Sequence, residues 1–443
     1  MIGCSYGTLF RVTVGGGSYQ EGLVSHIQGV PSGILIDERE IYFELLQRKP
    51  GQGELSSPRR EPDIPVIVTG VNSADTMPGF ANEGYTNGTP FTILIPNLDR
   101  HFEHVDAYQR TNRTPRPGHA SYASYLKYGH FDDAIGAGIF SGRYTSTIVA
   151  AGAVARRILK DRGIEIFAYV KEAAGVAMPD MDYDTVRDRV NVFKEFRARH
   201  DPIYNLVYGE ERIRPGMRML EKMAVLAEIE RMVPDIKRTP FDEKEVSDLM
   251  ALGAHPVLNC PHPDAAREMY DRIMAICEEG DSSGGMVEVV VRGLPAGVGE
   301  PVFGKLDGEL GRMMSIGTVK AVEVGAGMSV KDMTGSQSND QMFMKDGKVA
   351  FSGNNAGGIT GGLTTGQDVV ARLAIKPTPT IAKDQTTIDK VSLTDQKLSA
   401  ITRRDPTIVS RVWPVAEAFT AMVVLDQYMS NLAYQEMRKP YGG

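Results

Sequence analysis

A change of pattern at Thr145 is the feature that most constrains how this chain of 443 residues can fold. Before it, glycines and prolines separate short runs that favour strands, such as Pro65–Thr69 and Phe91–Ile95. After it, apolar residues recur at helical spacing as far as Asp161, and Gly163 supplies a stop signal. We therefore expect strands joined by functional loops, followed by a helix with a buried face.

Helical periodicity continues in the second half of the chain. The pattern predicts helices over Tyr183–Arg199, Gly216–Met232 and Asp264–Glu278. Met286–Arg292 alternates as a strand. The sequence contains no internal repeat, low-complexity tract or obvious linker, so we expect a single domain over residues 1–443.

Composition excludes several classes of protein. The 49 Lys+Arg and 56 Asp+Glu residues give a formal net charge of -7, which argues against binding of nucleic acid or of a membrane surface by the whole chain. Cys4, Cys260 and Cys277 are too few and too scattered for a disulfide framework. No apolar run approaches the roughly 20 residues that cross a bilayer, and no secretory signal is evident at the N-terminus. We expect a cytoplasmic protein.

The most informative motif is Arg116-Pro-Gly-His-Ala120. Further glycine- and arginine-rich segments accompany it in a fixed order along almost the whole chain: Gly7-Thr-Leu-Phe-Arg-Val-Thr13, Arg48-Lys-Pro-Gly-Gln52, Arg59-Arg-Glu-Pro-Asp63, Asn87-Gly-Thr-Pro90, Gly280-Asp-Ser-Ser-Gly-Gly285, Asn354-Asn-Ala-Gly-Gly358, Lys376-Pro-Thr378 and Arg403-Arg-Asp-Pro406. Collinear matches are far more specific than any single motif. In these segments the chain resembles the chorismate synthase family of flavoenzymes.

The resemblance implies an α+β fold, a β-α-β sandwich in which long helices lie between antiparallel sheets, and a homotetramer. Between about residues 172 and 259 the chain is longer and more helical than we expect for the family. This helical insertion could cap the active site, alter the oligomer interface or decorate the surface.

The resemblance also implies a reaction. In the family, 5-enolpyruvylshikimate 3-phosphate loses phosphate from C3 and a proton from C6 in an anti 1,4-elimination that gives chorismate. Reduced FMN is required and is not consumed. Since the sequence offers no persuasive second nucleotide site, we expect a separate flavin reductase or another reductant.

Arginines gather near the motifs, and planar guanidinium groups suit bidentate capture of carboxylate and phosphate. Such a set fits a small polyanionic substrate, whereas the alternative is a group of solvated surface charges. The candidate substrate-binding residues are Arg48, Arg59, Arg60 and Arg404. The residues that match cofactor-contacting positions of the family are Arg116, Ser141, Arg143, Asn87, Thr89, Asn355, Ala356, Gly357, Lys376, Thr380 and Arg403.

Four residues are candidates for catalysis. His119 matches a family histidine that protonates or orients reduced flavin, and an ordinary imidazole pKa of about 6.5 suits proton transfer. Asp405 matches the aspartate implicated in deprotonation at C6, although aspartate before Pro406 is also common in turns. Ser18 and Tyr19 complete the set, at a segment matching the family's G-E-S-H-G.

The chain departs from the family at grouped positions. Gly16-Gly-Ser-Tyr-Gln20 carries Tyr19 where the family has a catalytic histidine. The other departures are Ile139, Phe140, Tyr144 and Arg404. Because these changes would reshape a substrate pocket, three hypotheses remain. They are chorismate formation, a flavin-dependent 1,4-elimination from a related cyclohexene acid such as shikimate 3-phosphate, and a non-catalytic flavin-binding subunit.

Three other sequence patterns do not predict a nucleotide or metal site. The run Gly136–Gly142 lacks the spacing of a dinucleotide loop, and Gly299–Lys305 lacks the Ser or Thr of a phosphate-binding loop. His255, Cys260 and His262 lack a fourth ligand at a zinc-site spacing. We therefore expect no metal site.

Overall fold

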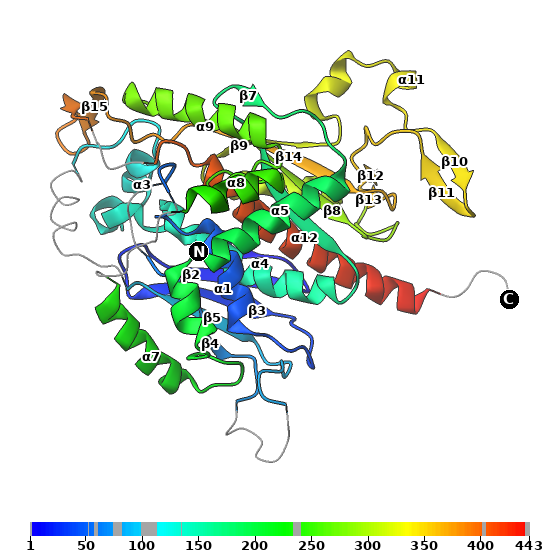
Figure 1. Ribbon diagram of the computed structural model, residues 1–443, viewed down its shortest axis with the longest axis horizontal. Helices are drawn as coiled ribbons and strands as arrows, with labels where there is room; N and C mark the ends of the chain where they lie inside the picture. The colour runs from blue at the N-terminus through cyan, green and yellow to red at the C-terminus, as the bar shows by residue number, and fades with distance from the viewer. Residues whose placement is uncertain are drawn as a thin grey trace.

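Two antiparallel sheets with long helices between them form the centre of the molecule (Figure 1). The computed structural model describes residues 2–51, 53–56, 61–73, 82–98, 113–133, 135–233, 241–400 and 405–438. The expected α+β fold, with helices between antiparallel sheets, is confirmed.

The first sheet is built from the N-terminal third of the chain. Its strands, in spatial order, are β1 (Ser5–Tyr6), β2 (Arg11–Gly16), β3 (Gly22–Gln28), β5 (Phe91–Pro96) and β4 (Val66–Thr69). All neighbours are antiparallel, and Val24 of β3 lies opposite Leu94 of β5. The two predicted strands are thus β4 and β5. β4 begins at Val66 rather than Pro65, a residue that has no N–H for the ladder.

The second sheet comes from later segments. Its strands, in spatial order, are β7 (Val176–Ala177), β6 (Glu165–Ala173), β8 (Gly285–Arg292), β14 (Val369–Ile375) and β9 (Val319–Val324). β8 is central: Val289 pairs with Ala168 on one side and with Ala371 on the other. The strand predicted over Met286–Arg292 is therefore confirmed, and the observed strand begins one residue earlier, at Gly285.

Helices α4 (Thr145–Lys160) and α12 (Val409–Met437) pack against each other between the sheets. α4 contacts β2, β3 and β5, whereas α12 contacts β6 and β8. Both helices are buried on all sides in their middle turns, as expected for a layer covered on two faces. A Cβ at Gly152 of α4 would lie only 2.4 Å from the Cβ of Ala418, so the two helices cross where glycine removes the side chain.

α12 carries Pro414 in its second turn. Proline cannot donate to the carbonyl four residues earlier, which belongs to Ser410. The indole Nε1 of Trp413 donates to that carbonyl at 3.0 Å. The side chain therefore satisfies the acceptor that the proline leaves without a helical partner.

α1 (Glu38–Arg48) packs against α4, α12 and α5 (Tyr183–Arg199). The Asp37 carboxylate caps its start by accepting from the N–H of Arg39 at 2.8 Å. Its last residue, Arg48, is buried beside the N-terminal end of α12. The end of α1 therefore places the guanidinium group of Arg48 in the interior of the fold.

Outer elements cover the two sheets. The helices are η1 (Ile2–Cys4), α3 (Ser121–Tyr128), η2 (Gly129–Phe131), η3 (Ile135–Phe140), η4 (Gly142–Tyr144), α6 (Pro202–Tyr204), η5 (Asn205–Gly209), α7 (Met219–Met232), α8 (Glu243–Ala251), α9 (Pro263–Glu278), α10 (Leu306–Gly311), η6 (Arg312–Ser315), η7 (Gly327–Asp332) and α11 (Gly335–Ser338). The hairpins are β10 (Met342–Lys345) with β11 (Lys348–Phe351), β12 (Ile359–Thr360) with β13 (Leu363–Thr364), and β15 (Gln385–Asp389) with β16 (Thr394–Leu398).

The predicted helices are present, with small differences at their starts. α5 has the predicted bounds, and α9 begins one residue early at Pro263, a residue favoured in the first turn. α7 begins at Met219 rather than Gly216, because Gly216 has a φ of 74° and cannot belong to a right-handed helix. Helices α5 to α8 lie within residues 172–259, but the single domain and the insertion stay predictions.

Candidate active site

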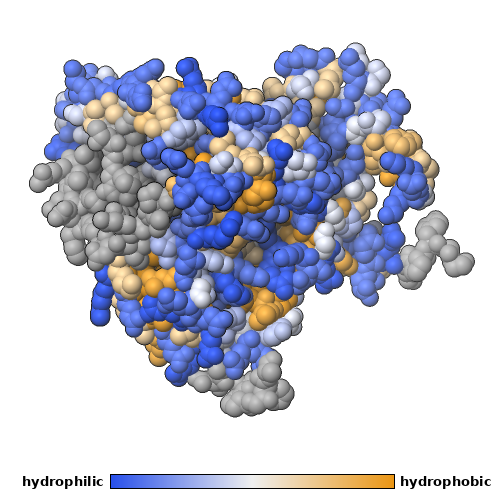
Figure 2. All heavy atoms as spheres, viewed as in Figure 1, coloured by the Kyte–Doolittle hydropathy of each residue, from blue (hydrophilic) through white to orange (hydrophobic). Residues whose placement is uncertain are grey.

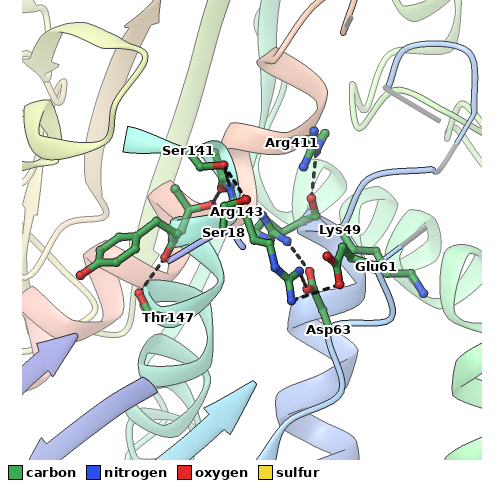
Figure 3. A network of polar contacts seen from close by, with 12 residues as sticks. Ser18, Lys49, Glu61, Asp63, Ser141, Arg143, Thr147 and Arg411 are labelled. Atoms are coloured by element: carbon green, nitrogen blue, oxygen red, sulfur yellow. Dashed lines mark hydrogen bonds and ion pairs between the residues drawn. The ribbon is translucent and has the colours of Figure 1, made fainter. Parts of the chain in front are cut away.

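Two buried arginines share one buried carboxylate near the centre of the fold. Arg48 comes from the end of α1, Arg143 from η4 just before α4, and Asp63 from the segment before β4. The Asp63 oxygens each form an ion pair with one guanidinium group, and Glu61 lies 3.3 Å from Arg143 Nη2 (Figure 3). We call Arg48, Glu61, Asp63 and Arg143 the arginine–carboxylate cluster.

Arg143 is held from several directions. Its Nε donates to Asn97 Oδ1 at 2.6 Å, and its Nη2 donates to the carbonyl of Pro96 at 3.3 Å. Both acceptors lie at the end of β5, so the first sheet fixes this side chain. Arg143 is only 4% exposed, and its donors serve contacts within the protein.

Two serines lie beside this cluster. Ser141 Oγ accepts from the N–H of Arg143 and donates to Ser18 Oγ, each at 3.3 Å (Figure 3). The ring of the neighbouring Tyr19 packs against Gly136, where a Cβ would lie 2.3 Å from the ring. The loop after β2 and the segment before α4 therefore meet at these side chains.

A second set of polar side chains surrounds the predicted histidine. Arg116 Nη2 lies 3.2 Å from His119 Nε2, and Arg116 Nη1 donates to Thr380 Oγ1 at 3.3 Å. Lys376 Nζ donates to the carbonyl of Gly118. We call Arg116, His119, Lys376 and Thr380 the His119 group. It unites a motif near residue 116 with the loop that follows β14.

The His119 ring is neutral at physiological pH in this arrangement. Its Nδ1 accepts from the N–H of Ser121 at 3.1 Å, while Nε2 faces the guanidinium of Arg116. An imidazolium needs acceptors at both nitrogens and would find donors. Burial, and then the charges of Arg116 and Lys376, lower the pKa of His119 to about 4. The ordinary imidazole pKa of about 6.5, which the sequence led us to expect for His119, therefore does not apply to the protein without bound ligands.

Asp405 lies between the two sets. Its main-chain oxygen accepts from Thr378 Oγ1 at 2.9 Å, in the same loop as Lys376 and Thr380. Its carboxylate pairs with Arg411 at 3.0 Å, and Arg411 Nε donates to the carbonyl of Arg48 at 3.0 Å. Contacts therefore run from the His119 group through Asp405 and Arg411 to the arginine–carboxylate cluster.

Comparison with known proteins shows the family of this chain. The family model for chorismate synthase matches residues 10–429. The chorismate synthase of Methanosarcina mazei is 35% identical over 432 residues, which are 97% of each chain. That of Acetivibrio thermocellus is 34% identical over 443 residues, covering 96% of this chain and 94% of the relative. The protein belongs to the chorismate synthase family.

The fold agrees as well. A crystal structure of a chorismate synthase superposes with a TM-score of 0.60 at 24% sequence identity, over 96% of this chain and 94% of that one. Relatives that match nearly the whole chain carry the chorismate synthase name, so neither the elimination from shikimate 3-phosphate nor the non-catalytic subunit is favoured. Members of this family are carbon–oxygen lyases that act on a phosphate.

Some predicted residues lie away from this chorismate synthase site. Asn87 and Thr89 are exposed before β5, at the strand end opposite Asn97. Asn355, Ala356 and Gly357 lie beyond the other end of β14 from Lys376, where the Asp340 carboxylate accepts from the N–H groups of Asn355 and Ala356 at 2.9 Å. A seven-residue strand spans about 20 Å, so one chain does not bring them to His119. Arg59, Arg60, Arg403 and Arg404 lie outside the described residues.

The positions that depart from the family are dispersed. Tyr19 lies next to the paired serines, whereas Phe140 is 44% exposed. Tyr144 packs against the hydrophobic core, and burial raises the pKa of its hydroxyl. Ile139 lies half-buried in η3. Tyr144 donates its N–H to the carbonyl of Ser141 at 3.0 Å, and Tyr19 directly follows Ser18 in the chain.

Sequence reasoning missed four residues of the site: Glu61, Asp63, Asn97 and Arg411. The first two belong to the quoted segment Arg59-Arg-Glu-Pro-Asp63, in which only the arginines were weighed. An acid in an arginine-rich motif is the signal that could have found them.

Within the described ranges, no group of three or more His, Cys, Asp or Glu side chains could hold a metal ion. Among the same residues, no helix is long and apolar enough to cross a membrane. In the described part of the chain, Cys4, Cys260 and Cys277 form no disulfide bond.

Proposed function

We propose that this protein forms chorismate from 5-enolpyruvylshikimate 3-phosphate by anti 1,4-elimination of phosphate. The observation that carries the proposal is a set of contacts that leads from His119 through Arg116 to Thr380, and from Thr378 in the same loop through Asp405 and Arg411 to Arg48. It gathers cations for a polyanionic substrate and proton-transfer groups into one region, and the family relationship supports the same reaction.

Reduced FMN is the proposed cofactor, and the donor set of the His119 group fits it. Two cations, Arg116 and Lys376, and the hydroxyl of Thr380 suit a phosphate or another anionic part of the flavin. His119 lies in the same group, with Nε2 3.2 Å from Arg116 Nη2, so its ring would lie beside such an anion. When bound, reduced FMN supplies electron density to the allylic system and an acceptor for the C6 proton.

The chain's own residues then have distinct tasks. Asp405, whose carboxylate is held by Arg411, is the residue that would take up the proton lost from C6. Ser18 and Tyr19 are the proposed donors beside the leaving phosphate, with Ser141 holding Ser18 in place. Arg59, Arg60 and Arg404 are proposed to attract the anionic substrate. Arg48 and Arg143 are buried and their guanidinium groups contact other groups of the protein, so they are proposed to hold the site together rather than to touch the substrate.

The remaining predicted cofactor residues point to a partner copy. Asn87 and Thr89 lie at the end of β5 away from Arg143, and Asn355–Gly357 lie at the end of β14 away from Lys376, so we propose that a second copy of the chain supplies them. The β10–β11 hairpin protrudes and exposes Met342 and Met344 by 71% and 68% (Figures 1 and 2). An exposed apolar hairpin of this kind supports the proposed homotetramer.

Residues 172–259 are proposed to support α1. α7 is tied to α1 by a buried ion pair between Lys222 and Glu38, and Gln47 Nε2 donates to the carbonyl of Lys194 on α5 at 3.2 Å. Because both sheets share one hydrophobic core, we propose a single domain. We also propose cytoplasmic action with a separate flavin reductase or another reductant.

An anaerobic assay tests the function. Purified protein, chemically reduced FMN and 5-enolpyruvylshikimate 3-phosphate should give chorismate and phosphate in equal amounts, with no net loss of reduced FMN. Shikimate 3-phosphate serves as the control substrate and should give no product. Turnover no greater than that of flavin alone would contradict the proposal.

A further inference from the structure

Asp63 is a charged side chain at the centre of the site for which the reaction described above has no task. It is fully buried, and each of its carboxylate oxygens contacts a different arginine. Arg48 and Arg143 come from elements separated by almost a hundred residues. A single carboxylate therefore sets the separation and orientation of two guanidinium groups.

The backbone at this residue is unusual. Asp63 has a φ of 56°, in the left-handed region that non-glycine residues adopt only at an energetic cost. Such conformations persist where the surrounding structure holds them, and they cluster at functional sites. The two ion pairs of Asp63 are contacts that hold the residue in this conformation.

Electrostatics keep the side chain ionised. Burial would raise the pKa of Asp63, but Arg143 and Arg48 together hold it at about 2. Burial also lowers the pKa of Arg48 to about 10, and the Asp63 carboxylate opposes that change. The charges of the pair are therefore constant over the pH range in which an enzyme works, so Asp63 is not a proton carrier.

Contacts lead from Asp63 to both sides of the site. On one side, Arg48 offers its carbonyl to Arg411, which holds Asp405. On the other side, the N–H of Arg143 donates to Ser141, which donates to Ser18. Figure 3 shows Arg143, Ser141, Ser18 and Arg411 around Asp63.

We propose that Asp63 is a positioning residue for the elimination. By fixing Arg48 and Arg143, it sets the distance between Asp405 on one side of the substrate and the Ser18–Ser141 pair on the other. Asp63 itself neither transfers a proton nor contacts a ligand. This inference rests on the proposed function.

Asp63→Asn tests the inference, because it preserves shape and removes the charge. Displacement of reacting groups by about 1 Å costs roughly 100-fold in rate, so kcat should fall by about that factor. KM should stay within about threefold, since binding is not what the residue provides. The matched control is Glu38→Gln, which removes one charge from the equally buried pair with Lys222. It should lose similar stability and keep its kcat.

A second variant tests the inference even if Asp63→Asn does not fold. Asp63→Glu keeps the charge but lengthens the side chain by one methylene, so it should fold and still lose about tenfold or more in kcat. Wild-type kcat in Asp63→Glu, or the same kcat in Asp63→Asn as in Glu38→Gln, would overturn the proposal.

Crystal structures of the variants separate this inference from the reaction itself. The Arg411–Asp405 and Ser141–Ser18 contacts should lengthen in Asp63→Asn and stay at 3.0 Å and 3.3 Å in Glu38→Gln. Unmoved contacts would overturn the positioning role whether or not the wild-type protein makes chorismate. An inactive wild type with displaced contacts in the variant would overturn the proposed function alone.

Discussion

Arg411 holds Asp405 through an ion pair in which Nη1 of the arginine lies 3.0 Å from Oδ1 of the aspartate. The same guanidinium donates from Nε to the carbonyl of Arg48 at 3.0 Å. One side chain at the start of α12 thus connects the candidate proton-removing group with the end of α1. Its planar fork fixes the direction of both contacts, whereas the three donors of an ammonium group impose no such planar geometry.

Arg411→Lys should therefore keep the positive charge and lose the geometry. We expect kcat to fall by about 10-fold to 100-fold because the Asp405 carboxylate loses its fixed direction. Steady-state kinetics with reduced FMN measures the change. Lys383→Met breaks the exposed pair with Asp281 and is the control, with an effect on stability within about 1 kcal/mol and none on kcat. Unaltered kcat in Arg411→Lys would exclude this role.

The low pKa of His119 predicts how stability depends on pH. The unfolded chain binds a proton below its ordinary pKa of about 6.5, whereas the folded protein does so only near 4. Stability should therefore fall as the pH drops through this window, by at most about 3 kcal/mol, and level off below it. His119→Gln should remove this contribution in denaturant unfolding curves recorded at several pH values.

His255 is a matched control for this histidine. Burial lowers its pKa to about 4 as well, but it lies beside Arg267 and Asp271 rather than in the site. Addition of oxidised FMN should raise the pKa of His119 towards its ordinary value and leave that of His255 unchanged, as followed by NMR titration. Equal responses of the two rings would mean that the flavin does not bind next to His119.

The helices that the sequence predicted and the helix that it missed differ in how far they are buried. α5 faces solvent on one side, so its apolar residues repeat at helical spacing and both ends were predicted. α12 is buried all round over residues 409–426 and contains Pro414, so it shows neither a clear stripe nor an uninterrupted helical run. It has no clear apolar stripe because the second sheet covers one side and helices α4 and α1 cover others.

The site shows a similar division. Motif order located His119, Arg116, Lys376 and Thr380, which do come together. Asp63 and Arg143 are 80 residues apart, and no local sequence pattern predicts that their side chains meet. The pKa of His119 could not be predicted either, since it depends on burial and on a lysine from another motif.

Gly152 offers a test of the helix layer. In Gly152→Ala, the new methyl group would lie 2.4 Å from the Cβ of Ala418 and would push α4 away from α12. Overpacking should cost about 1–3 kcal/mol despite the higher helix propensity of alanine. Gly308→Ala in α10 is the control, because its nearest contact would be an ordinary 3.9 Å. Urea unfolding should give lower stability for the first variant and unchanged or slightly higher stability for the second.

Tyr19 provides the sharpest test of the chemistry. A hydroxyl with a pKa of about 10 is a weaker proton donor to a leaving phosphate than an imidazolium, so Tyr19→His should raise kcat by about tenfold or more. The smaller ring also fits the space beside Gly136 that the tyrosine ring now fills. Tyr19→Phe, which keeps the ring and removes the hydroxyl, separates donation from packing and should lower kcat. Equal, efficient turnover by all three proteins on 5-enolpyruvylshikimate 3-phosphate would show that this position does not limit the elimination, and that the proton for the phosphate comes from elsewhere.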